Sequence, residues 1–63
     1  MSEELKDKII ASLRKIGEMF TGEIAKELKI SASTASKYLE ILYAEGKVKR
    51  REKRPYTYWC IKE

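Results

Sequence analysis

Apolar residues recur at helical spacing in three stretches of this 63-residue chain. The first predicts a helix over about residues 3–16, with a buried stripe of Leu5, Ile9, Ile10, Leu13 and Ile16. The second predicts a shorter helix over about residues 22–28, with a stripe of Ile24, Ala25 and Leu28. The third predicts a helix over about residues 32–45, with a core-facing stripe of Ala35, Tyr38, Leu39 and Leu42.

Residue types that begin and end helices lie at the ends of these stretches. Thr21 and Ser31 are the expected N-caps, because a hydroxyl oxygen can accept a hydrogen bond from a first-turn amide. Gly17 and Gly46 are expected to end the first and third helices, since glycine readily adopts the left-handed conformation that follows many helices. Residues 29–30 leave room only for a tight connection between the second and third helices.

The pattern changes after Gly46, where the chain favours β-structure. Residues 48–53 suit an edge strand, because basic side chains discourage further strand pairing. Residues 54–56 predict a turn, and residues 56–61 are the strongest β stretch of the chain. Together they predict a hairpin over about residues 47–61, with Trp59 and Ile61 on one face and Tyr56, Tyr58 and Cys60 on the other. Residues 18–20 are predicted only as a short extended piece.

The positive charge is concentrated near the C-terminal end. Residues 1–46 hold seven Lys and Arg against eight Asp and Glu, whereas residues 47–63 hold seven against two, a net charge of +5. A local positive field of this kind suits a polyanion such as a nucleic-acid backbone. The chain also lacks His, Asn and Gln and is rich in Lys and Glu, a bias that resembles proteins of hyperthermophiles.

The composition disfavours catalysis and membrane insertion. Cys60 is the only cysteine and there is no histidine, so we expect no internal disulfide, no metal and no cofactor. The sequence has no glycine-rich phosphate loop, and it places no acid–base pair and no nucleophile with its partner at a useful spacing. We therefore expect no enzyme activity. The chain has no run of about 18 apolar residues, the length that a membrane-spanning helix needs. A lone thiol is typical of a reducing, cytoplasmic setting.

The third predicted helix has an outward face of small or hydrogen-bonding side chains: Ala32, Ser33, Ser36, Lys37 and Glu40. A helix with such a face can lie close against another surface. Because a short helix precedes it and a basic hairpin follows it, the order of elements predicts a helix-turn-helix with a basic appendage. That combination favours binding to nucleic acid.

Residues 30–48, Ile-Ser-Ala-Ser-Thr-Ala-Ser-Lys-Tyr-Leu-Glu-Ile-Leu-Tyr-Ala-Glu-Gly-Lys-Val, resemble the recognition-helix segment of winged helix-turn-helix regulators of the ArsR and MarR type. Lys37 and Tyr38 stand where Arg and His are common in those families, and residues 20–28 resemble their positioning helix. The resemblance implies an α+β, mainly α fold: one winged helix-turn-helix domain over residues 1–63, with three helices followed by a β-hairpin wing. It also implies a small transcriptional regulator, from an archaeon, its virus or plasmid, or a bacterium.

The same resemblance implies how double-stranded DNA would be bound. The third helix would enter the major groove with its N-terminal residues near base edges, while the second crosses the backbone. By position, the groove-facing residues would be Ser31, Ala32, Ser33, Thr34, Ser36 and Lys37. The wing would lie along the backbone or minor groove through Lys49, Arg50, Arg51, Lys53, Arg54 and Tyr56. Alternate side chains of a hairpin point to opposite faces, so half of the wing residues point away from the duplex.

The chain also departs from these families. Its third helix has no Asn, Gln or Arg, the usual base readers, so sequence specificity is expected to be modest or to depend on DNA shape. The cysteine pair and histidines of metal-sensing ArsR proteins are missing, and no small-molecule effector is evident. The additional helices through which ArsR and MarR proteins dimerise are missing too. A homodimer would therefore have to use the first helix or the hairpin.

Three other functions are alternatives to duplex binding by a regulator. Residues 54–59, Arg-Pro-Tyr-Thr-Tyr-Trp, are similar to the wing of Z-DNA-binding winged helices, but the third helix lacks their Asn and Tyr at the matching positions. A ribosomal protein of the small subunit has the same winged-helix plan, usually with a basic N-terminal tail, whereas this chain begins Met-Ser-Glu-Glu. A winged-helix protein–protein adaptor would be marked by an acidic wing and an apolar outer helix face, which this chain lacks.

Overall fold

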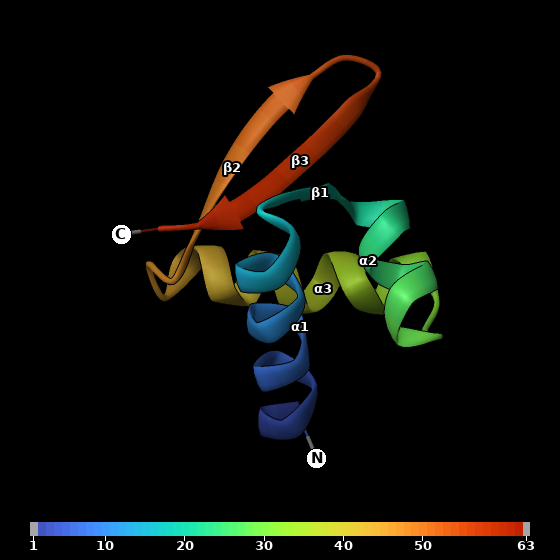
Figure 1. Cartoon of the computed structure of the whole chain (residues 1–63), viewed down its shortest axis with the longest axis vertical. Coiled ribbons are helices and arrows are strands. Elements are labelled where there is room, and N and C mark those ends of the chain that lie inside the picture. The colour runs from blue at the N-terminus through green and yellow to red at the C-terminus, as the bar shows by residue number, and fades with distance from the viewer. Residues whose placement is uncertain (1, 63) are drawn as a thin grey trace.

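Three helices and an antiparallel sheet make up the fold, as the sequence predicts (Figure 1). The computed structural model describes residues 2–62. The elements follow in the order α1 (Ser2–Ile16), β1 (Glu18–Phe20), α2 (Thr21–Leu28), α3 (Ala32–Ala44), β2 (Val48–Lys53) and β3 (Tyr56–Ile61). The β2–β3 hairpin projects beyond the helices as a wing. No helix within residues 2–62 is both long and apolar enough to cross a bilayer.

The helix ends follow local chemistry, with one exception. Gly17 and Gly46 have φ angles of 107° and 77°, in the left-handed region expected after a helix. The Ser31 side chain accepts a hydrogen bond from the Thr34 backbone N–H at 3.1 Å, so the predicted cap of α3 is confirmed. The predicted cap at Thr21 is wrong. Thr21 is already the first residue of α2, and its hydroxyl accepts a hydrogen bond from the Trp59 indole at 2.9 Å.

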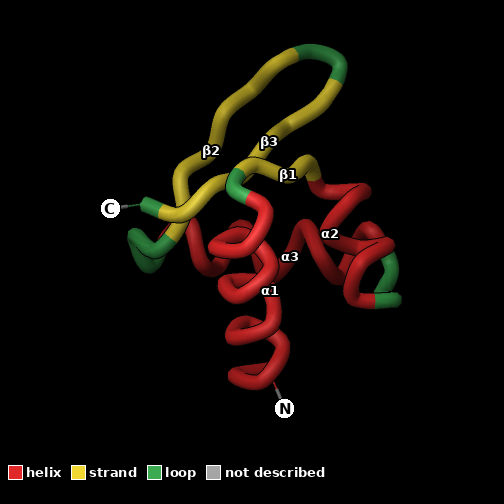
Figure 2. The backbone as a smooth tube through the Cα atoms, in the orientation of Figure 1, coloured by secondary structure: helices red, strands yellow, loops and turns green. Residues whose placement is uncertain are grey.

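The sheet has a strand that the sequence did not assign to it. β3 lies in the middle and pairs with β2 on one side and β1 on the other, both antiparallel. Met19 of β1 lies opposite Trp59, and Val48 of β2 lies opposite Ile61. The extended residues after α1 therefore complete a three-stranded sheet, which fixes the base of the wing against the helices (Figure 2).

The core lies between the helices and one face of the sheet. The sheet contributes Met19, Val48 and Trp59, each at most 3% exposed. The helices contribute the remaining buried apolar side chains: Ile9, Leu13, Ile24, Ala25, Ala35, Leu39 and Leu42. Ile16 was predicted to be buried with the α1 stripe, but it is 53% exposed because it lies in the last turn, beyond the packed part of the helix. The helix stripes thus meet the Trp59 face of the wing.

Candidate nucleic-acid interface

The outer face of α3 is an exposed polar stripe. Ser33, Lys37 and Glu40 are exposed and Ser36 is half-buried, while Leu39 on the opposite side of the helix is fully buried. Residues three and four positions apart are neighbours on a helix surface, so these four polar side chains form one continuous stripe. Within the described part of the chain, Lys37 takes part in no ion pair. Its ammonium group is therefore available to an anionic partner.

The first turn of α3 has a different character. Ser31 caps the helix, and its hydroxyl also donates to the Thr34 hydroxyl at 2.9 Å. Thr34 is half-buried, whereas Ala32 is exposed. Ser31 and Thr34 are thus committed to each other, and the small side chain of Ala32 leaves the start of the helix open to close approach. Of the predicted groove-facing residues, Ser33, Ser36 and Lys37 have the most freedom to contact a ligand.

The wing presents its side chains on two opposite faces, because successive residues of a strand alternate. Val48 and Trp59 are buried against the helices, so Arg50, which lies opposite Trp59 in the register, belongs to this inner face. Lys49, Arg51, Lys53 and Tyr56 alternate with these positions and belong to the outer face, away from the helices. Arg54 lies in the turn at the tip. The structure therefore separates the predicted wing residues into two sets.

An aromatic contact joins α3 to the inner face of the wing. The rings of Tyr43 and Trp59 meet edge to face, with centroids 6.2 Å apart, and the Arg50 guanidinium lies 5.9 Å from the centroid of the Trp59 ring. Ser36 and Tyr43 are seven positions apart and so lie on the same side of α3. The polar stripe of α3 consequently leads along one side of the helix to Tyr43 and, through Trp59, to Arg50. A shallow groove between the end of α3 and the edge of β2 is lined by Tyr43, Ala44, Gly46 and Arg50, among others.

The outer face of the sheet carries its own charged cluster. Glu18 of β1 pairs with the Lys53 ammonium at 3.0 Å and with the Arg51 guanidinium at 3.6 Å. On the inner face, Arg50 pairs with Glu52 at 3.3 Å. These are exposed pairs, which contribute little to stability and exchange readily with other partners.

A further ion pair fixes the C-terminal end of α3. The Lys6 ammonium of α1 lies 3.0 Å from the Glu45 carboxylate, just beyond the last residue of α3. Hydrogen bonding to Lys6 lowers the pKa of Glu45, and the same bond raises the pKa of Lys6. The pair ties the C-terminal end of α3 to α1, close to the point where the chain enters β2.

Sequence reasoning missed three contributors to this surface. Glu40 lies within the α3 stripe but was not named as a site residue, because the helix-turn-helix pattern emphasises the first turns of the helix. Neither Tyr43 nor Trp59 is among the predicted site residues; Trp59 is buried, but Tyr43 is 49% exposed. Their mutual contact depends on the packing of β3 against α3, which no local pattern reveals. Among residues 2–62, no cluster of His, Cys, Asp and Glu could hold a metal ion.

This arrangement of three helices, a polar third helix and a projecting basic hairpin defines a winged helix-turn-helix domain of the DNA-binding type. The chain belongs to the arsR family of bacterial regulatory proteins, whose sequence model matches residues 4–50. The match ends within β2, so it includes α3 but not the second strand of the wing. None of the curated proteins matches the chain.

Solved structures similar to the chain include Zalpha domains and a bacterial protein. The apo Zalpha domain of zebrafish PKZ is 28% identical, with a TM-score of 0.92, over 98% of this chain and 97% of its own. The Zalpha domain of PKZ from Carassius auratus, solved in complex with Z-DNA, is 28% identical, with a TM-score of 0.88, over 95% of each chain. YusO from Bacillus subtilis is 20% identical, with a TM-score of 0.87, over 90% of this chain and 43% of its own, which shows the fold alone.

Proposed function

We propose that this protein binds right-handed double-stranded DNA and acts as a transcriptional regulator. In this proposal α3 lies in the major groove and the inner face of the wing lies on the adjacent backbone. The observation that supports it best is a surface that runs from the polar stripe of α3 past exposed Tyr43 to Arg50. Tyr43 and Arg50 each contact the ring of Trp59, which is itself buried. One duplex lying along that surface would contact both the helix and the wing. Membership of the arsR family supports the regulatory role.

The individual side chains suit different parts of a duplex. Ser33 and Ser36 are short donors and acceptors that can bond phosphates or either type of base, and Lys37 can reach a guanine edge or a phosphate. Arg50 and Arg54 are suited to the backbone, where guanidinium groups pair with phosphate oxygens. Glu40 can only accept hydrogen bonds when ionised, and the cytosine amino group is the major-groove donor it would match. Without such a donor its negative charge would be repelled by phosphates, so Glu40 would favour duplexes that present a cytosine at this position.

The salt dependence of binding tests which face meets the duplex. If Lys37, Arg50 and Arg54 are the cations that contact phosphates, a plot of log affinity against log salt should have a slope of about −2.7. If all six predicted cations took part, the slope would be about −5.4. Fluorescence anisotropy of a labelled duplex over a series of salt concentrations distinguishes the two values.

Neighbouring residues of β2 provide a matched control. Arg50 and Arg51 lie on opposite faces of the strand, and each pairs with one carboxylate. Arg50→Ala and Lys37→Ala should each reduce the salt slope by about 0.9 and weaken all duplexes, whereas Arg51→Ala should leave the slope unchanged. Equal losses in Arg50→Ala and Arg51→Ala would contradict the assignment of the inner face. Full affinity in Lys37→Ala would contradict the role of α3.

A second candidate is binding to left-handed Z-DNA. It is favoured by the Zalpha domains, which match this chain along nearly the whole length of both, including the Pro55-to-Trp59 part of the wing. A related domain was solved with ds(CG)6, at 29% identity and a TM-score of 0.91. It is disfavoured because α3 has neither an Asn nor a Tyr at the positions that match theirs.

Circular dichroism of the DNA separates the two candidates. Protein is added to ds(CG)6 in stoichiometric excess, and the near-ultraviolet spectrum of the DNA is followed. A spectrum that keeps its right-handed form while anisotropy reports binding supports the first candidate. Inversion of the spectrum supports the second, and would show that the wing and α3 recognise the Z form without those two side chains.

A further inference from the structure

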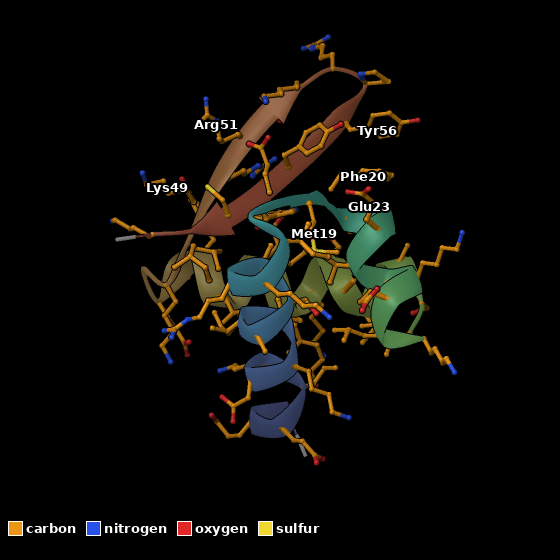
Figure 3. The ribbon with its side chains drawn as sticks, in the orientation of Figure 1. Met19, Phe20, Glu23, Lys49, Arg51 and Tyr56 are labelled. Carbon is orange, nitrogen blue, oxygen red and sulfur yellow. The ribbon has the colours of Figure 1, made fainter. Side chains whose placement is uncertain are left out.

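We propose that the outer face of the sheet is a second nucleic-acid-binding surface, which takes the unpaired bases of single-stranded DNA. This surface consists of the aromatic residues Phe20, Tyr56 and Tyr58 and the basic residues Lys49, Arg51 and Lys53. It lies on the side of the sheet opposite the helices, so it is separate from the duplex surface proposed above and does not depend on it (Figure 3).

The aromatic residues form a connected cluster at the β1–β3 side of the sheet. The ring centroids of Phe20 and Tyr56 are 4.5 Å apart with a tilt of 32°, and those of Phe20 and Tyr58 are 5.8 Å apart in an edge-to-face arrangement. Tyr56 is 49% exposed although its ring is held against Phe20. The Phe20 backbone N–H donates to the Glu23 carboxylate at the start of α2, which ties this residue to the helix. The exposed ring of Tyr56 is therefore presented on a rigid support.

The basic residues follow β2, next to this cluster. Lys49, Arg51 and Lys53 lie opposite Cys60, Tyr58 and Tyr56 in the strand register, so a row of cations runs beside the column of aromatic residues. The Lys53 ammonium is 5.3 Å from the centroid of the Tyr58 ring. Figure 3 shows Lys49 and Arg51 along β2, with Tyr56 of β3 and Phe20 of β1 farther across the sheet. A single strand would occupy both rows at once, with its phosphates along the cations and its bases on the aromatic residues.

The chemistry of the two rows selects an unpaired strand. A base stacks on an aromatic side chain through its flat face, which is covered by neighbouring pairs in a duplex but free in a single strand. An anionic strand also matches the positive charge of β2, whereas an apolar or basic protein segment would not. Exposed aromatic residues on a sheet, flanked by cations, are the combination that binds single strands with little sequence preference.

Glu18 sets the strength of this surface. Its carboxylate holds Arg51 and Lys53 by exposed ion pairs, and a phosphate must displace it to reach both cations. The Glu18 side chain is 32% exposed and contacts both cations. Glu18→Gln removes the competing charge and releases both cations, so it should tighten single-strand binding by roughly two- to fivefold. A surface that used these cations only for stability would show no such gain.

The test uses the full chain and a fluorescently labelled oligo(dT) strand. Tyr56→Ala should weaken binding by roughly 5- to 150-fold, the loss expected from one base–aromatic stack. Tyr56→Trp should retain binding, because it keeps a stacking surface. Thermal unfolding of each variant checks that it is folded. If Tyr56→Ala does not fold, the affinities of Glu18→Gln and Tyr56→Trp for oligo(dT) still test the proposal. Unchanged affinity in Glu18→Gln, or lost affinity in folded Tyr56→Trp, overturns it.

Competition locates the strand on the correct face. Unlabelled oligo(dT) should leave a bound duplex in place, and Lys37→Ala should leave oligo(dT) binding unchanged. Displacement of the duplex by one equivalent of oligo(dT) would place the strand on α3 and overturn the proposal. Oligo(U) that binds more tightly than oligo(dT), with the same response to Glu18→Gln, would overturn the choice of DNA in favour of RNA. Failure of duplex binding would remove only the displacement measurement, and the responses of oligo(dT) binding to Glu18→Gln, Tyr56→Trp and Lys37→Ala would still decide this proposal.

Discussion

The hydrogen bond between Trp59 and Thr21 joins the wing to the start of α2, and its removal tests how the wing is held. The indole N–H donates to the Thr21 hydroxyl at 2.9 Å, and Trp59 is only 2% exposed. Thr21→Val keeps the shape of the side chain but removes the acceptor. The indole N–H is a donor only, and burial prevents water from replacing the lost partner, so the cost should be about 1–3 kcal/mol.

This cost is large for a domain of this size. At roughly 4–8 °C per kcal/mol, the midpoint of thermal unfolding should fall by about 4 °C at the least and about 24 °C at the most. Far-ultraviolet circular dichroism during heating measures the midpoint. Thr21→Ser is the matched control, because it keeps the hydroxyl and loses only a half-buried methyl group. Its unfolding midpoint should fall by much less.

A double-mutant cycle isolates the bond itself. Trp59→Phe removes the donor, so adding Thr21→Val to it should cost about 0.5–1.5 kcal/mol less than adding Thr21→Val to the wild type. A Thr21→Val midpoint within about 1 °C of the wild type, or additive costs in the cycle, would refute the reasoning that this bond stabilises the junction.

Three further predictions concern α3. Leu39→Ala should cost about 2–5 kcal/mol because Leu39 is fully buried, while exposed Ile16→Ala should cost under about 0.5 kcal/mol. The first cost is a large part of the roughly 3–5 kcal/mol that the core of so small a domain supplies, and denaturant titration followed by circular dichroism measures both. Glu45→Gln should abolish the part of the acid dependence of stability that comes from the Lys6 pair. In the wild type, the stabilisation from Glu45 is present above pH 4.5 and is lost as pH falls through its lowered pKa, while the stabilisation from Lys6 is present below pH 10.5 and is lost as pH rises through its raised pKa. Denaturant titrations from pH 3 to pH 7 measure the acid side. The same pH dependence of the free energy of unfolding in the wild type and in Glu45→Gln would contradict this prediction. Glu40→Gln should strengthen binding to scrambled duplexes and reduce the preference for the best site by about fivefold or more, measured by competition anisotropy.

The helices and the two-faced wing could be predicted from sequence because they follow from local periodicity. The buried stripe around Leu39, the cap at Ser31 and the stop at Gly46 each depend on residues within one or two turns. The placement of Trp59 on the opposite face from Tyr58 follows from simple alternation along the strand. These features recur wherever the same local pattern recurs, and the structure confirms them.

Features that depend on distant pairing could not be predicted. β1 has only three residues, and its place in the sheet comes from pairing Met19 with Trp59, forty positions away. Threonine is a common helix cap, but the Thr21 hydroxyl instead accepts a hydrogen bond from the indole of Trp59, which is distant in the sequence. Alternation separates Arg50 from Lys49 and Arg51, but which of the two sets faces the helices requires the register of β2 against β3, which local periodicity does not give. Which cations share a face with α3 is therefore a property of the fold.

The most direct test of the duplex surface is to map it with nuclear magnetic resonance. The uniformly ¹⁵N-labelled protein is titrated with a short duplex, and the change in each backbone amide signal is recorded. The largest changes should fall on residues 32–40 and at Arg50, with the signals of Phe20 and Tyr56 nearly unmoved. Changes concentrated on Phe20, Arg51 and Tyr56, or spread over α1, would contradict the claim that α3 and the inner face of the wing form one duplex-binding surface.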